Sequence, residues 1–362
     1  MIERLIGELK EVCAGLPDKR VGPRRDGEYG MADIGLSAFS IFFMGSPSFL
    51  AHQRALQRGH GRSNCQTLFG MSAIPSDNYI RLMLDGVPPS AFDRLFLRAV
   101  EAAGSLSPFQ RLGGRVLIAL DGTEHFCSRK IHCQNCCTRR RSDGGTEYFH
   151  AFLGASLVAP GHQRVMPLPA EFIAPQHGAQ KQDCERDAAK RWLAKHGPYI
   201  ADLRPVYLGD DLFACQPIAE AINAVGGNFI LTCKPASHQT ITEYLDGAEV
   251  SEHRQIVSKR GKRTTTIYRW LSGIPLRATE DALAVNWFSV EIHNHSGKRN
   301  YYNSFVTDLP VTADNVAELA ACGRARCRVG GDVAIPTPHS AGRADFPHPV
   351  PHGRDSLTEA YG

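Results

Sequence analysis

Two short apolar runs, each ending at an aspartate, constrain the fold of this chain more than any other feature. Residues 116–120 lead into Asp121, and residues 205–208, followed by a glycine, lead into Asp210. A short apolar run without polar alternation is typical of a strand that is buried on both faces, as in a parallel sheet. Functional side chains of open sheets gather outside the strand ends. The two runs therefore predict an α/β fold in which Asp121 and Asp210 meet at one edge of the sheet.

The segments around the two runs alternate between strand and helix patterns. One amphipathic helix is bracketed by Gly178 and Gly197-Pro198, and a second ends at Gly226-Gly227. These elements comprise strands over 148–158, 165–173 and 229–233, and helices over 180–196 and 215–225. Their order predicts a mixed sheet flanked by helices.

Composition and pattern divide the chain into five parts. The tail carries repeated prolines without any periodicity, so it is expected to be disordered. The parts are a helical N-terminal region and candidate DNA-binding region (1–110, with helices over 31–50 and 90–103), the first part of the core (111–237), a β-rich insertion (238–309, with strands over 256–270, 287–292 and 301–307), the last core helix with Asp314 as its N-cap (310–330), and the tail (331–362).

Two aspartates at neighbouring strand ends are suited to a metal-dependent reaction. Carboxylates are hard oxygen ligands, which Mg²⁺ and Mn²⁺ prefer. Such ions activate a water or a 3′-hydroxyl and stabilise the leaving oxygen of a phosphodiester. Each aspartate has a simpler alternative role as a turn or cap residue.

Four segments resemble insertion-sequence DDE transposases of the IS-four type. They read FFMGSPSFL at 42–50, LDGTE at 120–124, LGDDLF at 208–213 and FILTCKP at 229–235. The resemblance covers residues 31 to about 326. It implies an RNase H-like sheet with a β-rich insertion, and it makes Asp121 and Asp210 the first two metal ligands. Asp211 is the neighbour to test if Asp210 proves wrong.

The resemblance also implies an activity and partners. Transposases of this group hydrolyse DNA at transposon ends and transfer the cut strands into target DNA. The expected partners are double-stranded DNA and a second copy of the chain, as a homodimer on DNA. Two rival functions stay open, namely a DNA-binding transposase remnant without catalysis and an RNase H-like nuclease unrelated to transposition.

The chain departs from the family pattern at the third carboxylate. Family members carry an arginine, then an aromatic residue, and a glutamate four positions after the arginine. Here Arg326 fits the arginine, but Cys327 and Gly330 occupy the other two positions. Glu318 cannot replace the missing glutamate, because it would lie about 18 Å along a helix from the position of Gly330. We therefore expect impaired catalysis, and we hypothesise that the tail is an out-of-frame translation.

A cysteine motif suggests a second metal. His132, Cys133, Cys136 and His150 include a C-x-x-C unit with two histidines, a set that could bind zinc. No second cysteine pair is evident nearby, so an unmetallated loop is the alternative.

Clusters of cations are candidates for DNA contact. Phosphate binding needs grouped lysines and arginines, although the net charge of +4 is mild. A solvated surface is the alternative for each group. The candidates are Arg139, Arg140, Arg141, Lys234, Lys259, Arg260, Lys262, Arg263 and Arg326.

The N-terminal sequence and the hydropathy favour a cytoplasmic, nucleoid-associated protein. No segment approaches the roughly 18 apolar residues of a membrane span. Glu3 stands where a signal peptide carries positive charge. The cysteines are accordingly expected to be reduced thiols or metal ligands.

Overall fold

The computed structural model describes residues 2–20, 22, 28–57, 68–71, 75–175, 182–259 and 262–328. The tail predicted to be disordered, 331–362, lies outside these residues. The chain forms two compact units, one of residues 1–104 with 127–149 and the other of residues 105–126 with 150–334. None of the described helices is long and apolar enough to cross a membrane.

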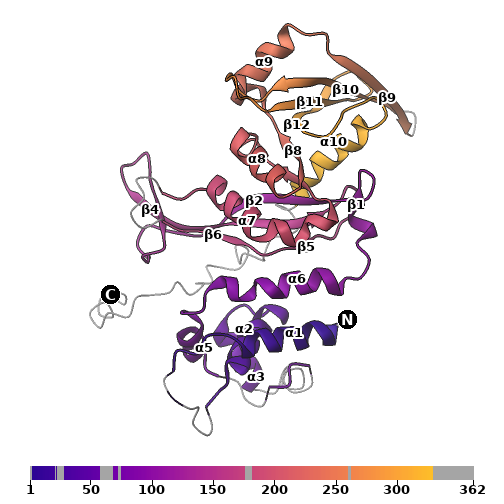
Figure 1. The fold of residues 1–362 in the computed structure, drawn as a ribbon. Helices are drawn as coiled ribbons and strands as arrows, with labels where there is room; N and C mark the ends of the chain where they lie inside the picture. The colour runs from indigo at the N-terminus through magenta and orange to yellow at the C-terminus, as the bar shows by residue number, and fades with distance from the viewer. Residues whose placement is uncertain are drawn as a thin grey trace. The chain divides into compact units, whose positions relative to one another are not determined.

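The first unit contains the helical N-terminal region (Figure 1). The predicted helix over 31–50 is divided in two at Gly45, whose φ of +61° suits glycine. α1 packs against α2 and α6, and their buried faces form one core. The helices are α1 (Ile2–Ala14), α2 (Met31–Phe43), α3 (Phe49–Gln57), α5 (Asp77–Leu84), η1 (Pro89–Phe92) and α6 (Asp93–Ala102).

A mixed sheet of twelve strands runs in the order β3-β4-β2-β7-β8-β12-β11-β10-β9, with β1, β5 and β6 beside this path. The predicted α/β class with a mixed sheet flanked by helices is confirmed. The strands are β1 (Gln110–Arg111), β2 (Arg115–Ser128), β3 (Cys137–Arg140), β4 (Thr146–Val158), β5 (Met166–Pro167), β6 (Glu171–Ile173), β7 (Val206–Gly209), β8 (Asn228–Thr232), β9 (Ser251–Lys259), β10 (Lys262–Pro275), β11 (Ala284–His293) and β12 (Arg299–Thr307).

Three parallel strands form the centre of the second unit. β2 pairs with β7, and β7 pairs with β8. The apolar run of β2 is at most 2% exposed, as its sequence predicts. This unit also contains η2 (Ser107–Phe109), α7 (Glu185–Ile200), η3 (Ala201–Leu203), α8 (Gln216–Ala224), η4 (Pro235–Ser237), α9 (Gln239–Asp246), α10 (Val316–Arg324) and η5 (Ala325–Arg328).

Helices cover both faces of these central strands. Trp192 of α7 contacts Tyr207 on one face, with ring centroids 6.2 Å apart. On the other face, α10 approaches so closely that a Cβ on Gly323 would lie 3.1 Å from Ile230. Both faces of β7 and β8 are therefore buried, which explains their apolar sequences.

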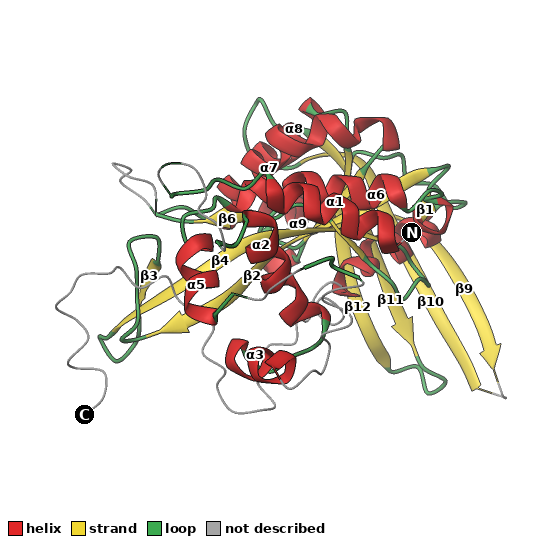
Figure 2. Cartoon of the chain, turned by 90° about the horizontal axis from the view of Figure 1, so that it is seen from below, coloured by secondary structure: helices red, strands yellow, loops and turns green. Residues whose placement is uncertain are grey.

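The strands expected as a β-rich insertion continue the core sheet. β12 pairs antiparallel with β8, with Val306 opposite Leu231. β11, β10 and β9 follow as antiparallel neighbours, side by side in Figure 2. The core and the insertion share one hydrogen-bonded sheet.

Several element boundaries differ from the sequence-based expectation. β2 continues past Asp121 to Ser128, because the similarly long β4 lies beside it in the sheet. The segment over 165–173 divides into β5 and β6. The N-cap of α10 is Asn315 rather than Asp314; its side chain accepts from Thr312 N at 2.9 Å.

α7 begins and ends later than its pattern predicts. It starts at Glu185 and runs through Gly197 and Pro198 to Ile200. Gly197 is a packing residue rather than a stop, since a Cβ there would lie 2.9 Å from Val225. Pro198 falls in the last turn, where one missing N–H removes only one helical hydrogen bond.

Candidate active site

The sheet register brings Asp121 and Asp210 together. β2 and β7 are parallel, with Ala119 opposite Leu208. Two residues further along each chain, the same register places Asp121 beside Asp210, on strands that are typically about 4.8 Å apart. Both aspartates are half-buried, directly beyond fully buried strand residues.

The electrostatics of Asp121 agree with this placement. Burial raises the pKa of Asp121, the Arg326 guanidinium lowers it, and the nearby Asp210 raises it. Arg326 Nη1 lies 3.1 Å from Asp121 Oδ1. Asp121 is therefore a desolvated carboxylate between one like charge and one opposite charge.

A third carboxylate, which the sequence analysis misses, belongs to the same cluster. Glu185 is the first residue of α7, and burial raises its pKa, followed by repulsion from Asp210 and from Asp121. A Cβ built on Gly122 would lie 2.1 Å from Glu185 Cδ, so the carboxylate rests on the bare backbone of β2. The only available signal is the glycine directly after Asp121, which leaves space for a neighbour.

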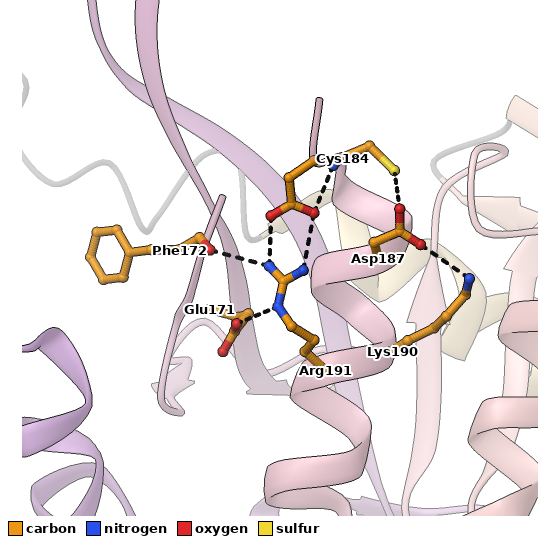
Figure 3. Close-up of polar contacts among 7 residues, drawn as sticks. Glu171, Phe172, Cys184, Asp187, Lys190 and Arg191 are labelled. Carbon is orange, nitrogen blue, oxygen red and sulfur yellow. Dashed lines mark hydrogen bonds and ion pairs between the residues drawn. The ribbon is translucent and has the colours of Figure 1, made fainter. Parts of the chain in front are cut away.

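A network of polar contacts fixes the segment before α7 (Figure 3). Arg191, one turn further into the helix, donates from Nη1 and Nη2 to Asp183 at 3.0 and 2.8 Å. It also donates to Glu171 Oε1 at 2.8 Å and to Phe172 O at 3.3 Å, both on β6. Asp183 is almost fully buried, so this charge pair is well shielded from water. The start of α7 is thereby tied to β6.

A second set of contacts orders the first turn of α7 (Figure 3). Cys184 Sγ donates to Asp187 Oδ2 at 3.3 Å, and Lys190 pairs with Asp187 at 3.1 Å. Glu185 lies between these anchored residues. Its backbone is consequently held in place while its side chain reaches β2.

Asp211, the neighbour to test in place of Asp210, has a different role. Its Oδ1 accepts from Lys234 N at 2.6 Å and lies 3.2 Å from His238 Nε2. Asp210 Oδ1 accepts from Leu212 N at 2.9 Å, which turns the loop after β7. Asp210, rather than Asp211, is the residue that acts electrostatically on Asp121 and Glu185.

The oxygen chemistry of these three side chains, rather than a preformed ligand geometry, suits a hard divalent cation; in the described residues, the set of three ligand atoms within 4.8 Å of one another is that of Cys133, Cys136 and His150. Asp121, Asp210 and Glu185 offer only carboxylate oxygens, which are the preferred ligands of Mg²⁺ and Mn²⁺. Their mutual repulsion is relieved by a positive charge placed among them.

Three of the four predicted zinc ligands lie close together. The ligand atoms of Cys133, Cys136 and His150 are all within 4.8 Å of one another. His132 is not in this group. Its ring stacks on Tyr148 with centroids 4.3 Å apart, and its Nδ1 lies 3.2 Å from Lys130 O.

Two arginines of the predicted DNA-binding triplet are engaged in ion pairs. Arg139 and Arg141 pair with Glu147 at 2.6 and 2.9 Å. These contacts, led by Arg139, lower the pKa of Glu147 to about 2. Arg140 is exposed on β3. The triplet is therefore partly neutralised.

The basic hairpin of β9 and β10 is only partly described. The side chains of Lys259 and Lys262, and all of Arg260, lie outside the described residues, while Arg263 is exposed. Lys234 is also exposed, and its backbone N–H orders Asp211.

Comparison with known proteins assigns no family to the chain. Neither a scan against protein-family models nor a search of the curated proteins returns a match. A function has to be proposed from the residues themselves.

Proposed function

We propose that this chain is a DDE-type transposase whose metal ligands are Asp121, Asp210 and Glu185. It would hydrolyse DNA at insertion-sequence ends and transfer the cut strands. The observation that carries the proposal is the electrostatic proximity of three carboxylates: Asp121 within β2, Asp210 directly after β7, and Glu185 at the start of α7. The four segments that resemble IS-four transposases supply the choice of DNA as substrate.

The mechanism assigns binding and orientation to the residues of the chain. A bound Mg²⁺ or Mn²⁺ supplies the charge that activates a water or a 3′-hydroxyl and stabilises the leaving oxygen. Asp121 and Asp210 would hold the ion from the sheet, and Glu185 would hold it from the anchored start of α7. No covalent link between protein and DNA is required, because catalysis rests on positioning and electrostatics.

Glu185 removes the reason to expect an impaired enzyme. The family pattern predicts the third carboxylate at the position of Gly330, which lies outside the described residues. In this proposal, Glu185 supplies that ligand from another element. The partners remain double-stranded DNA and a second copy of the chain.

The proposal is tested first by metal binding. Asp210→Asn is expected to lower Mn²⁺ affinity by at least about tenfold, because it removes one charged ligand. Asp211→Asn is the matched control, since its carboxylate is occupied by Lys234 and His238. Electron paramagnetic resonance of free Mn²⁺ measures both affinities. Equal affinities in the two variants would contradict the assignment.

The substrate is tested by DNA cleavage. Full-length protein is incubated in Mn²⁺ with duplexes that carry the inverted repeats flanking the gene, or with scrambled duplexes. Cleavage confined to the repeats supports transposition. Equal cleavage of both duplexes favours a general nuclease, and binding without cleavage favours a DNA-binding remnant.

We further propose that Cys133, Cys136 and His150 bind one zinc ion, with solvent as the fourth ligand. Protein purified without added metal is expected to contain about one zinc per chain. Cys136→Ser should lose it, whereas Cys215→Ser should keep it. Substitution with Co²⁺ provides a second measurement, the thiolate-to-cobalt absorption band. A zinc content near zero with no cobalt band would exclude the site.

A further inference from the structure

Arg326 is the cation that pairs with Asp121, one of the three carboxylates. It lies on η5, the turn after α10, and its Nη1 is 3.1 Å from Asp121 Oδ1. The two side chains are 21% and 28% exposed, so the pair is partly shielded from solvent. Within the described parts of the chain, no other ion pair involves Asp121, Asp210 or Glu185.

The neighbouring arginine shows that this placement is specific. Arg324, two residues earlier at the end of α10, lies over the ring of Tyr301 with its Cζ 4.5 Å from the centroid. Basic residues at this helix end are therefore not all directed at the carboxylates. Arg326 alone of the two has Asp121 as its partner.

The charge balance of the cluster gives Arg326 a function. Burial raises the pKa of Glu185 and of Asp121, and repulsion from Asp210 adds to the rise in both. The Arg326 guanidinium acts in the opposite direction on Asp121. In the structure, Arg326 is thus the opposite charge in direct contact with Asp121, at 3.1 Å.

The contact leaves most of the guanidinium available. Arg326 donates one hydrogen bond to a described residue, from Nη1 to Asp121. A guanidinium has five N–H donors in a planar arrangement that matches phosphate oxygens. The same side chain could therefore bind a phosphate of the DNA backbone.

We propose that Arg326 exchanges partners, pairing with Asp121 in the metal-free protein and with a DNA phosphate once a divalent cation occupies Asp121. A cation at Asp121 repels the guanidinium and takes over its role as counter-charge. The inference rests on the proposed metal-binding function of the three carboxylates. It makes Arg326 a positioning residue that links metal binding to DNA binding.

Arg326 could compete with the metal ion for Asp121 or could simply hold Asp121 in position. The two roles predict opposite changes in metal affinity when Arg326 is removed. If Arg326 competes with the metal, its removal raises metal affinity, because a positive charge and a rival partner are both lost. If Arg326 only holds Asp121 in position, its removal lowers metal affinity. Linkage also requires that, under competition, metal binding strengthens DNA binding.

The first experiment measures Mn²⁺ binding to the full chain without DNA. Arg326→Gln is expected to bind Mn²⁺ about tenfold more tightly than the wild type. Arg326→Lys should resemble the wild type, because it restores the charge. Arg324→Gln is the matched control, with the same change in charge at the same helix end. Unchanged or weaker Mn²⁺ binding by Arg326→Gln would overturn the exchange.

The second experiment measures DNA affinity by fluorescence anisotropy, in Ca²⁺ and in EDTA. Wild-type affinity for a duplex is expected to rise by about fivefold or more with Ca²⁺, and that of Arg326→Gln by clearly less. An equal rise in both would contradict the exchange. The failure of the proposed function has a separate signature, in which neither Asp121→Asn nor Asp210→Asn weakens Mn²⁺ binding.

Discussion

Glu185→Gln is expected to lower the rate of Mn²⁺-dependent DNA cleavage by at least about a hundredfold, as Asp121→Asn should. Glutamine keeps the size of the side chain and removes the charge that holds the cation. The free energy of unfolding should not fall, because Glu185 is a desolvated carboxylate repelled by Asp210 and Asp121. Single-turnover cleavage and denaturant unfolding without metal measure the two effects.

Glu280→Gln provides the control for this variant. Glu280 is exposed, and its substitution makes the same change in charge away from the cluster. It should keep wild-type cleavage. Full activity of Glu185→Gln would exclude Glu185 as the third ligand and return the chain to a site of two carboxylates.

Gly122→Ala is expected to lower cleavage by about tenfold to a hundredfold while the protein stays folded. The added Cβ would lie 2.1 Å from Glu185 Cδ, so the carboxylate has to move away from β2. Its displacement is inexpensive for the fold, because only the far end of a flexible side chain moves. Cleavage and Mn²⁺ affinity should therefore fall together, with little change in melting temperature.

Gly154→Ala is the matched control on the neighbouring strand β4. A Cβ there would lie 3.5 Å from Phe152 and 3.6 Å from Asp121 O, which are ordinary contacts. The double variant Gly122→Ala/Glu185→Gln should cleave DNA no more slowly than Glu185→Gln, since both changes remove the same ligand. A further loss in the double variant would mean that Gly122 acts independently of Glu185.

The aspartates could be predicted from sequence because their signal is local. A buried parallel strand leaves an apolar run, and the first polar residue after the run marks where full burial ends. Asp121 and Asp210 each follow such a run. The register of β2 and β7 then places the pair side by side without any loop conformation having to be known.

Glu185 could not be found in the same way because its position depends on tertiary contacts. The amphipathic pattern begins a helix near residue 180, which places Glu185 inside the helix rather than at its start. The observed start is set by Arg191 bonding Asp183 and the β6 backbone. Hydrogen bonds between distant segments leave no periodic signal in a sequence.

The ion-pair partners of the cationic clusters could not be predicted, because composition does not reveal which carboxylates lie beside a lysine or arginine in the fold. Arg139 and Arg141 share Glu147, and Arg269 on β10 pairs with Glu252 and Glu291. Charges paired in this way contribute less to a long-range attraction for DNA. Of the members of these two groups whose side chains the structure describes, Arg140 and Arg263 are exposed and have no ion pair shown.

Under the proposed function, the ladder between β12 and β8 limits how the second unit could respond to a DNA duplex. A flap on a flexible tether could swing to enclose its ligand. Strands β9 to β12, in contrast, are joined through β12 to β8, and β8 pairs with β7, the strand that leads to Asp210. Swinging them would require the breakage of inter-strand hydrogen bonds in the interior of the sheet. Under the proposed function, the deformation that brings a phosphodiester to Asp121 would therefore fall on the double helix rather than on these strands.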